Sequence, residues 1–148
     1  MPQINRFSKA YKAVAWNMPG YGKSILIGKM SFPSLAGSLL TLIEDRSWKK
    51  VHLIGHSMGG MVAQEFAVAH QDRLHSLTLF ATSPAFGRPD GDFQKQFVES
   101  RLAPLSAGIT MADLADKLVD KMMSPNALSS GRRLAYECMA DISPETYR

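Results

Sequence analysis

Apolar residues along the first half of the chain fall either into short unbroken runs or at helical spacing. Three runs are rich in β-branched and aromatic residues and end near turn signals, which predicts three buried strands: Tyr11–Asn17, "KVHLIG" (residues 50–55) and "LHSLTLFAT" (residues 74–82). Between them, residues 31–46 and 58–71 repeat apolar side chains every three or four positions, which predicts two helices, with Ser31 as the N-cap of the first. This alternation implies a parallel sheet with crossover helices, and therefore an α/β fold.

The pattern changes after Pro84. The Pro- and Gly-rich loop "PAFGRPDGD" precedes three segments with helical spacing, and no strand is predicted after Thr82; the helical segments are Phe93–Leu102, Met111–Met123 and Ala127–Met139. We therefore expect an α/β part at residues 1–84 and an all-helical part at residues 85–148.

The stretch "GHSMG" at residues 55–59 lies where the second predicted strand passes into a helix. It matches G-x-S-x-G, which arises by chance in about 5% of chains of this length. Its position is the stronger evidence, because a nucleophile elbow requires a strand before the serine and a helix after it. We expect a strained turn that raises the Ser57 Oγ above the sheet. Gly55 and Gly59 would let the strand and helix approach, and Gly60 would let the new helix pack closely.

These positions predict the chemistry of acyl transfer. Ser57 would attack a carbonyl carbon, and the Met58 N–H would stabilise the developing oxyanion at the positive end of the helix dipole. The alternative is that Ser57 only caps the helix, which would leave the three neighbouring glycines without a role.

A second stretch, "NMPGYGKS", ends in Gly-Lys-Ser after a predicted strand. A phosphate-binding loop of the form G-x-x-x-x-G-K-[ST] would need glycine at the position of Asn17, and Pro19 lacks an N–H that could hold phosphate. We therefore expect no phosphate site here.

Composition and charge narrow the function further. The chain has 148 residues with 45% hydrophobic and 20% charged side chains, typical of one soluble domain. The net charge of +4 is scattered, which argues against nucleic-acid binding. No membrane-spanning run and no signal peptide is present in the sequence, so a cytoplasmic location is expected. A lone Cys138 excludes an internal disulfide and a thiolate metal site, and no metal or other cofactor is expected.

The stretches "AWNMPGYGKS" and "LIGHSMGGMVAQEFA" together resemble the α/β-hydrolase fold superfamily. Members often carry D-x-P-G-x-G-x-S before the elbow; here Asn17 replaces the aspartate, at a position that is usually structural. The segment "ESRLAPLSAGITMADLADKLVDKMM" is similar to the helical cap of 3-oxoadipate enol-lactonase-type and carboxylesterase members. The resemblance implies a partial α/β-hydrolase fold whose parallel strands and crossover helices are followed by a cap region.

In this family the nucleophile is followed by an acid and then by a histidine. The resemblance therefore places both partners beyond Arg148, and it places a missing strand between residues 13–16 and 51–54. We expect a chain truncated at both ends, in which residues 2–10 are the end of a helix and the second oxyanion donor is lacking.

The four histidines in the chain are not expected to serve Ser57. His56 should project away from Oγ, and His52 should be a satisfied core histidine of the central strand. His70 and His75 fall at the opposite end of the sheet, and Asp72 beside them is expected to be a solvated charge.

The expected function is hydrolysis of a small ester, lactone or related carbonyl substrate, with this chain inactive alone. Phe86, Phe93 and Met122 are candidates for the wall of an apolar pocket. The alternative is a non-catalytic protein that binds a small ligand or a partner and has kept only the elbow. The sequence leaves the oligomeric state open.

Overall fold

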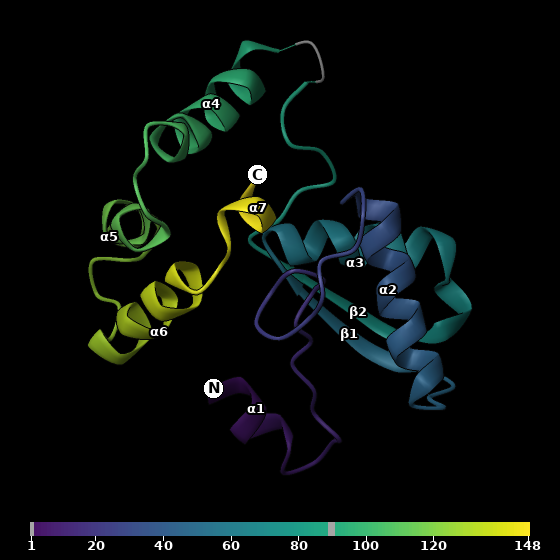
Figure 1. Ribbon diagram of the computed structural model, residues 1–148. Coiled ribbons are helices and arrows are strands. Elements are labelled where there is room, and N and C mark those ends of the chain that lie inside the picture. The colour runs from purple at the N-terminus through teal and green to yellow at the C-terminus, as the bar shows by residue number, and fades with distance from the viewer. Residues whose placement is uncertain (1, 89–90) are drawn as a thin grey trace.

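The computed structural model describes residues 2–88 and 91–148. Figure 1 shows a part containing two strands with helices beside them, and an arc of helices that follows it. In chain order the elements are α1 (Pro2–Phe7), α2 (Phe32–Asp45), β1 (Val51–His56), α3 (Met58–Ala69), the 3₁₀ turn η1 (Gln71–Arg73), β2 (Leu74–Phe80), α4 (Asp92–Ser106), α5 (Met111–Met122), α6 (Ser129–Ala140) and α7 (Pro144–Tyr147).

The two strands pair in parallel, with Gly55 opposite Leu79 and His56 opposite Phe80. Helix α3 connects them and packs on both, and α2 packs on α3. The predicted parallel sheet with a crossover helix is therefore confirmed, as are the helices predicted on either side of β1. Ser31 caps α2 as expected, with its side chain accepting from the Ser34 N–H.

The strand predicted at Tyr11–Asn17 is wrong. The segment lies along the sheet without joining it: the Tyr11 ring meets the His52 ring edge-on at 5.7 Å between centroids, and the Lys12 Nζ lies 5.5 Å from the centre of the Trp48 ring. A strand exists only where a neighbour pairs with its backbone. Among the described residues β1 pairs only with β2, so this extended segment has no ladder partner.

The prediction that the strands are buried holds for only one face of the sheet. Side chains of one face, including Val51 and Leu53, pack against the core beneath α2 and α3. On the other face Ile54 is 49% exposed and Phe80 is 53% exposed, because no helix of the described chain covers them. His52 lies on this open face and is exposed rather than part of the core.

Most of the buried apolar side chains form two clusters. One lies among α2 and α3 and consists of Ala36, Leu39, Ile43 and Phe66. The other lies among α4, α5 and α6 and consists of Leu105, Met111, Leu114, Ala115, Val119 and Met139. The three predicted C-terminal helices are confirmed, and the described residues after Thr82 contain no strand. Helix α7 then returns toward the first part, where the Thr146 hydroxyl donates to the Gly20 carbonyl over 3.2 Å.

Candidate active site at the β1–α3 turn

Ser57 occupies the sharp turn between β1 and α3 in a backbone conformation that few residues other than glycine adopt. Its φ is 50° and its ψ is −123°, so the predicted strained turn is present. The Ser57 N–H donates to the Phe80 carbonyl over 3.3 Å, which extends the β1–β2 ladder into the turn. The side chain is exposed at the end of the strand. The sheet therefore holds the backbone of the candidate nucleophile directly.

The glycines around Ser57 do not all have the roles expected of them. A Cβ on Gly55 would lie 2.6 Å from the Gly60 Cα and 2.7 Å from the Gly59 carbonyl oxygen, which is closer than real Cβ atoms approach. A Cβ on Gly59 would meet no described atom within 4 Å apart from its chain neighbours and the backbone of its own helix. The close approach of strand and helix is therefore between Gly55 and Gly60, because the helix turns the Gly59 Cα away from the strand.

The segment after β2 also leaves no room for a side chain at Gly60. A Cβ there would lie 2.6 Å from the side chain of Thr82, which follows β2. The Thr82 Oγ1 donates to the Ser57 carbonyl over 2.7 Å, and that carbonyl also accepts from the N–H groups of Gly60 at 2.9 Å and Met61 at 3.3 Å. Thr82 thus packs against the helix and holds the turn by a hydrogen bond.

Sequence reasoning did not single out Thr82. The available signal was its place just after a predicted strand that neighbours the elbow strand, since parallel strands bring their C-terminal ends to one edge. The Gln64 side chain adds a second link between the same elements, donating to the Ser83 carbonyl over 3.2 Å and to the Gly60 carbonyl over 3.1 Å.

Met58 is the first residue of α3, and its N–H therefore has no intrahelical acceptor. The first turn of the helix contains no acidic residue. The positive end of the helix dipole is thus free of competing negative charge on its own helix, which favours an anion beside Ser57.

None of the four histidines forms a hydrogen bond to the Ser57 Oγ in the described part of the chain. His56 stacks on Phe80, with the ring centroids 4.8 Å apart. The His52 Nδ1 lies 2.8 Å from the Ser76 Oγ, so this histidine is hydrogen-bonded as expected although it is not in the core. His75 stacks on His52 at 5.2 Å, and His70 contacts Phe66 at the far end of α3. Each histidine ring therefore contacts a residue other than Ser57.

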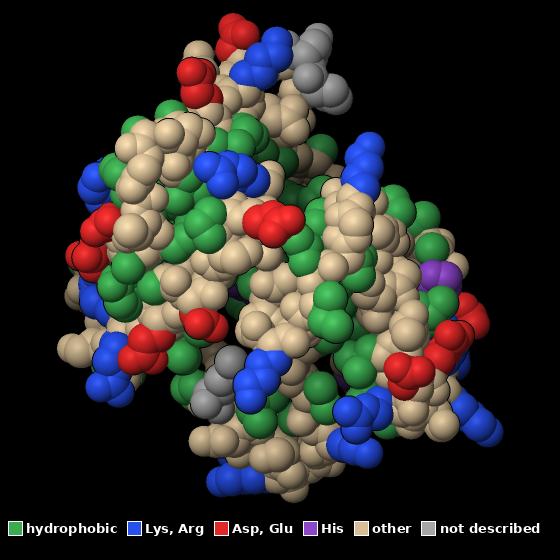
Figure 2. Space-filling model, viewed as in Figure 1, with side chains coloured by type: hydrophobic (Ala, Val, Ile, Leu, Met, Phe, Trp, Pro, Cys, Tyr) green, Lys and Arg blue, Asp and Glu red, His purple; other side chains and the backbone are tan. Residues whose placement is uncertain are grey.

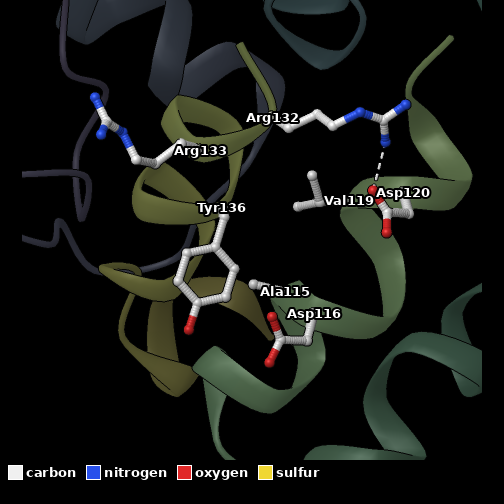
Figure 3. A pocket seen from close by; sticks show the side chains of 7 residues that line it. All are labelled: Ala115, Asp116, Val119, Asp120, Arg132, Arg133 and Tyr136. Atoms are coloured by element: carbon white, nitrogen blue, oxygen red, sulfur yellow. Dashed lines mark hydrogen bonds and ion pairs between the residues drawn. The ribbon is translucent and has the colours of Figure 1, made fainter. Parts of the chain in front are cut away.

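Two surface hollows lie away from the elbow. One, of about 300 Å³, lies between α5 and α6, and the Arg132–Asp120 ion pair spans part of its rim (Figure 3). The other, of about 380 Å³, is bordered by Glu44, Trp48 and Arg73. Neither hollow is lined by Ser57 or by the predicted pocket residues Phe86, Phe93 and Met122.

Residues 2–88 and 91–148 contain no group of three or more His, Cys, Asp or Glu side chains arranged to hold a metal ion. Among the same residues, no helix has both the length and the apolar character needed to cross a bilayer. Figure 2 shows the charges spread over the visible face, with hydrophobic side chains exposed between them.

Comparisons with known proteins identify the family. The model of the alpha/beta hydrolase fold family matches residues 2–124. The pimeloyl-[acyl-carrier protein] methyl ester esterase of Aeromonas hydrophila is 38% identical over 85 residues, which are 56% of this chain and 32% of that protein. The corresponding esterase of Pectobacterium carotovorum is 33% identical over 89 residues, or 60% of this chain and 33% of that protein.

Solved structures agree on the fold. The enol-lactonase from Burkholderia xenovorans LB400 superposes with a TM-score of 0.82 at 21% identity, covering 99% of this chain and 55% of that one. An esterase from Exiguobacterium antarcticum gives a TM-score of 0.76 at 19% identity, covering 88% of this chain and 50% of that one. The chain thus matches about a third of the length of the curated relatives and about half of these structures. With a family match over most of its residues, the chain belongs to the alpha/beta hydrolase fold family.

Proposed function

We propose that Ser57 is the nucleophile of a hydrolase that cleaves a small ester, lactone or related carbonyl substrate. The observation that carries this proposal is the backbone of Ser57, which has a φ of 50° between a strand and a helix N-terminus. Strain of this kind persists only where surrounding contacts impose it, and here the Phe80 and Thr82 hydrogen bonds do so. A serine that only capped the helix would hydrogen-bond its first turn, and the Ser57 side chain makes no such bond.

The proposed reaction has two steps. The Ser57 Oγ forms a bond to the carbonyl carbon while a histidine takes its proton, and the Met58 N–H donates to the oxygen that becomes negative. The intermediate then releases the alcohol, which takes its proton from the same histidine. Water attacks the acyl-enzyme in the same way and frees the acid and the serine hydroxyl.

The general base must come from outside these 148 residues in this proposal. None of the four histidines forms a hydrogen bond to the Ser57 Oγ among the described residues; His52 bonds to the Ser76 hydroxyl, and the other three rings pack against aromatic or histidine rings. The matched relatives and structures are about two to three times as long as the part that aligns with this chain, which leaves room for a histidine and its acid.

The names of the relatives support the reaction class. They act, by name, on a methyl ester or on an enol-lactone, and both reactions open a bond between a carbonyl carbon and oxygen. The alternative function is a binding protein that retains the elbow. The observation that favours it is that no residue among 2–88 and 91–148 forms a hydrogen bond to the Ser57 Oγ.

The gene sequence beyond the codon for Arg148 separates the two functions. The hydrolase proposal expects an open reading frame that encodes an acid after a strand, and then a histidine. The protein expressed from that longer frame should hydrolyse p-nitrophenyl acetate, and Ser57→Ala should lower its kcat by at least about 10³-fold. A stop codon after Arg148, or a longer protein whose Ser57→Ala variant keeps full activity, would overturn the hydrolase proposal.

A further inference from the structure

The residue directly after β2, Ala81, has a second strained backbone at the elbow end of the sheet. Its φ is 49°, in the left-handed region that residues with a side chain seldom adopt, and the φ of Ser57 after β1 is 50°. Strain of this kind persists only where surrounding contacts impose it. The proposed nucleophile gives the strain at Ser57 a role and leaves the strain at Ala81 without one.

The residues on either side of Ala81 both bind the backbone of Ser57. The Phe80 carbonyl accepts from the Ser57 N–H over 3.3 Å, and the Thr82 Oγ1 donates to the Ser57 carbonyl over 2.7 Å. In a regular strand the carbonyls lie in the plane of the sheet and the side chains stand out of it. The turn at Ala81 therefore lets a carbonyl and a side chain from one segment hold both sides of the same residue.

The Ser57 carbonyl and the Met58 N–H are the two ends of one peptide group. The carbonyl is directed at the Thr82 hydroxyl and into the first turn of α3, where it accepts from the Gly60 N–H at 2.9 Å and the Met61 N–H at 3.3 Å. A trans peptide is planar, so its N–H points opposite to its carbonyl. The Met58 N–H therefore points out of the helix N-terminus, and any rotation that moves the carbonyl moves this N–H as well.

Hydrogen bonds to the carbonyl also strengthen the N–H at the other end of the peptide. Donors at the oxygen draw electron density from the amide nitrogen, and linked hydrogen bonds strengthen one another by about 10–30% each. The Gly60 and Met61 donors belong to α3 itself, as the first N–H groups of a helix do. The Thr82 donor comes from the segment after β2, so it ties the orientation of this peptide to the neighbouring strand.

We propose that Thr82 is a positioning residue of the reaction at Ser57: its hydroxyl orients and polarises the Ser57–Met58 peptide, so that the Met58 N–H stays aimed at the substrate oxygen that becomes negative. This inference rests on the proposed function, which supplies the nucleophile and the oxyanion. That oxygen gains its charge only as the Ser57 Oγ bonds to the carbonyl carbon. Loss of the Thr82 hydroxyl should therefore lower kcat and leave KM nearly unchanged.

The link between Thr82 and the Met58 N–H is measured by NMR on the 148-residue chain. The Ser57 carbonyl ¹³C and Met58 amide ¹⁵N signals both report on hydrogen bonds to that carbonyl. Thr82→Val keeps the shape of the side chain without the donor and should move both signals upfield, whereas Thr82→Ser should leave them close to their original positions. The matched control is Thr78→Val, at an exposed threonine of β2 that pairs with Ile54, and it should move neither signal.

The consequence for the reaction is measured on the protein expressed from the longer reading frame. Its substrates are p-nitrophenyl acetate and the thiono analogue, in which sulfur, a weak hydrogen-bond acceptor, replaces the carbonyl oxygen. Thr82→Val should lower kcat for the ester about tenfold with little change in KM, and should lower turnover of the thiono analogue much less. Thr82→Ser should restore the ester rate. A substitution that only displaced the Ser57 Oγ would slow both substrates equally.

Unchanged Ser57 and Met58 signals in Thr82→Val, equal loss of both substrates, or full ester kcat in a folded Thr82→Val protein would each overturn the inference. Activity that survives in Ser57→Ala, or a stop codon after Arg148, would instead overturn the proposed function, so the two failures are distinguishable. Helical circular dichroism verifies that each variant is folded, and Thr82→Ala takes the place of Thr82→Val if the valine variant is not.

Discussion

The Thr82 hydroxyl donates a hydrogen bond to the carbonyl oxygen of Ser57 over 2.7 Å. This bond joins the segment that follows β2 to the turn that follows β1, and it lies beside the close contact between Thr82 and Gly60. The strained turn is thus fixed from the neighbouring strand as well as from its own helix.

Thr82→Val should loosen the start of α3. Valine keeps the shape of the side chain and loses the donor to the Ser57 carbonyl, at a cost of about 1 kcal/mol. Hydrogen exchange of the Gly60 and Met61 amides should therefore accelerate about fivefold. Thr82→Ser retains the hydroxyl and is the control. Equal exchange rates in the valine and serine variants would show that the hydroxyl does not hold the turn.

Gly60→Ala and Gly59→Ala should have opposite effects although the residues are adjacent on one helix. The new Cβ at position 60 would lie 2.6 Å from Thr82 and should cost about 1–3 kcal/mol. At position 59 the space is open, and alanine should stabilise the helix by up to about 1 kcal/mol. Exchange protection of the α3 amides measures both effects. If both substitutions changed the exchange protection of the α3 amides in the same direction, the difference in space at the two glycines would not control stability.

Sequence patterns predicted most of the helices and the position of the elbow, because these depend on local spacing and on residues next to Ser57. These patterns gave wrong predictions where the structure depends on contacts between segments that are distant in the sequence. Residues 11–17 have the composition of a strand, yet pairing requires a neighbour that the described chain does not supply. The role assigned to Gly59 belongs to Gly60, because which helical position faces the strand depends on the helix rotation. The hydrogen bond from Thr82 to the Ser57 carbonyl depends on tertiary packing that no local pattern encodes.

Asp113 should make the stability of α5 depend on pH in the acid range. The Thr110 hydroxyl and then the Thr110 N–H donate to its carboxylate and hold the pKa of Asp113 below its ordinary value of 3.8. The folded pKa lies below the unfolded one, so the contribution is present above pH 3.8 and is lost as the pH falls through the folded value.

The comparison of Asp113→Ala with the unsubstituted chain measures this contribution through helical circular dichroism. The difference in stability between the two should be constant near neutral pH and should shrink as the solution becomes more acidic than the unfolded pKa. Asp116→Ala, an exposed aspartate in the same helix outside the cap, should show no comparable difference. If the difference in stability between Asp113→Ala and the unsubstituted chain grew toward low pH, the expected direction of the pH dependence would be wrong.

The open face of the sheet should make the chain aggregate. Ile54 and Phe80 are adjacent to the elbow on this face and are about half exposed. Exposed strands that carry apolar side chains are templates for association. Ile54→Lys and Phe80→Lys should each raise the concentration at which light scattering appears. Val68→Lys, at an isolated position on α3 that is 88% exposed, should do so much less. A sharp thermal transition of a monomer at high concentration would contradict this expectation.

In the proposed reaction Ser57 is a nucleophile whose base lies outside these residues. The most direct measurement is the rate of p-nitrophenyl acetate hydrolysis by the 148-residue chain beside its Ser57→Ala variant at equal protein concentration. We expect the same rate for both, because no histidine bonds to the Ser57 Oγ in the described chain. A rate above background that disappears in Ser57→Ala would contradict it, since a base within the chain would then have to activate the serine.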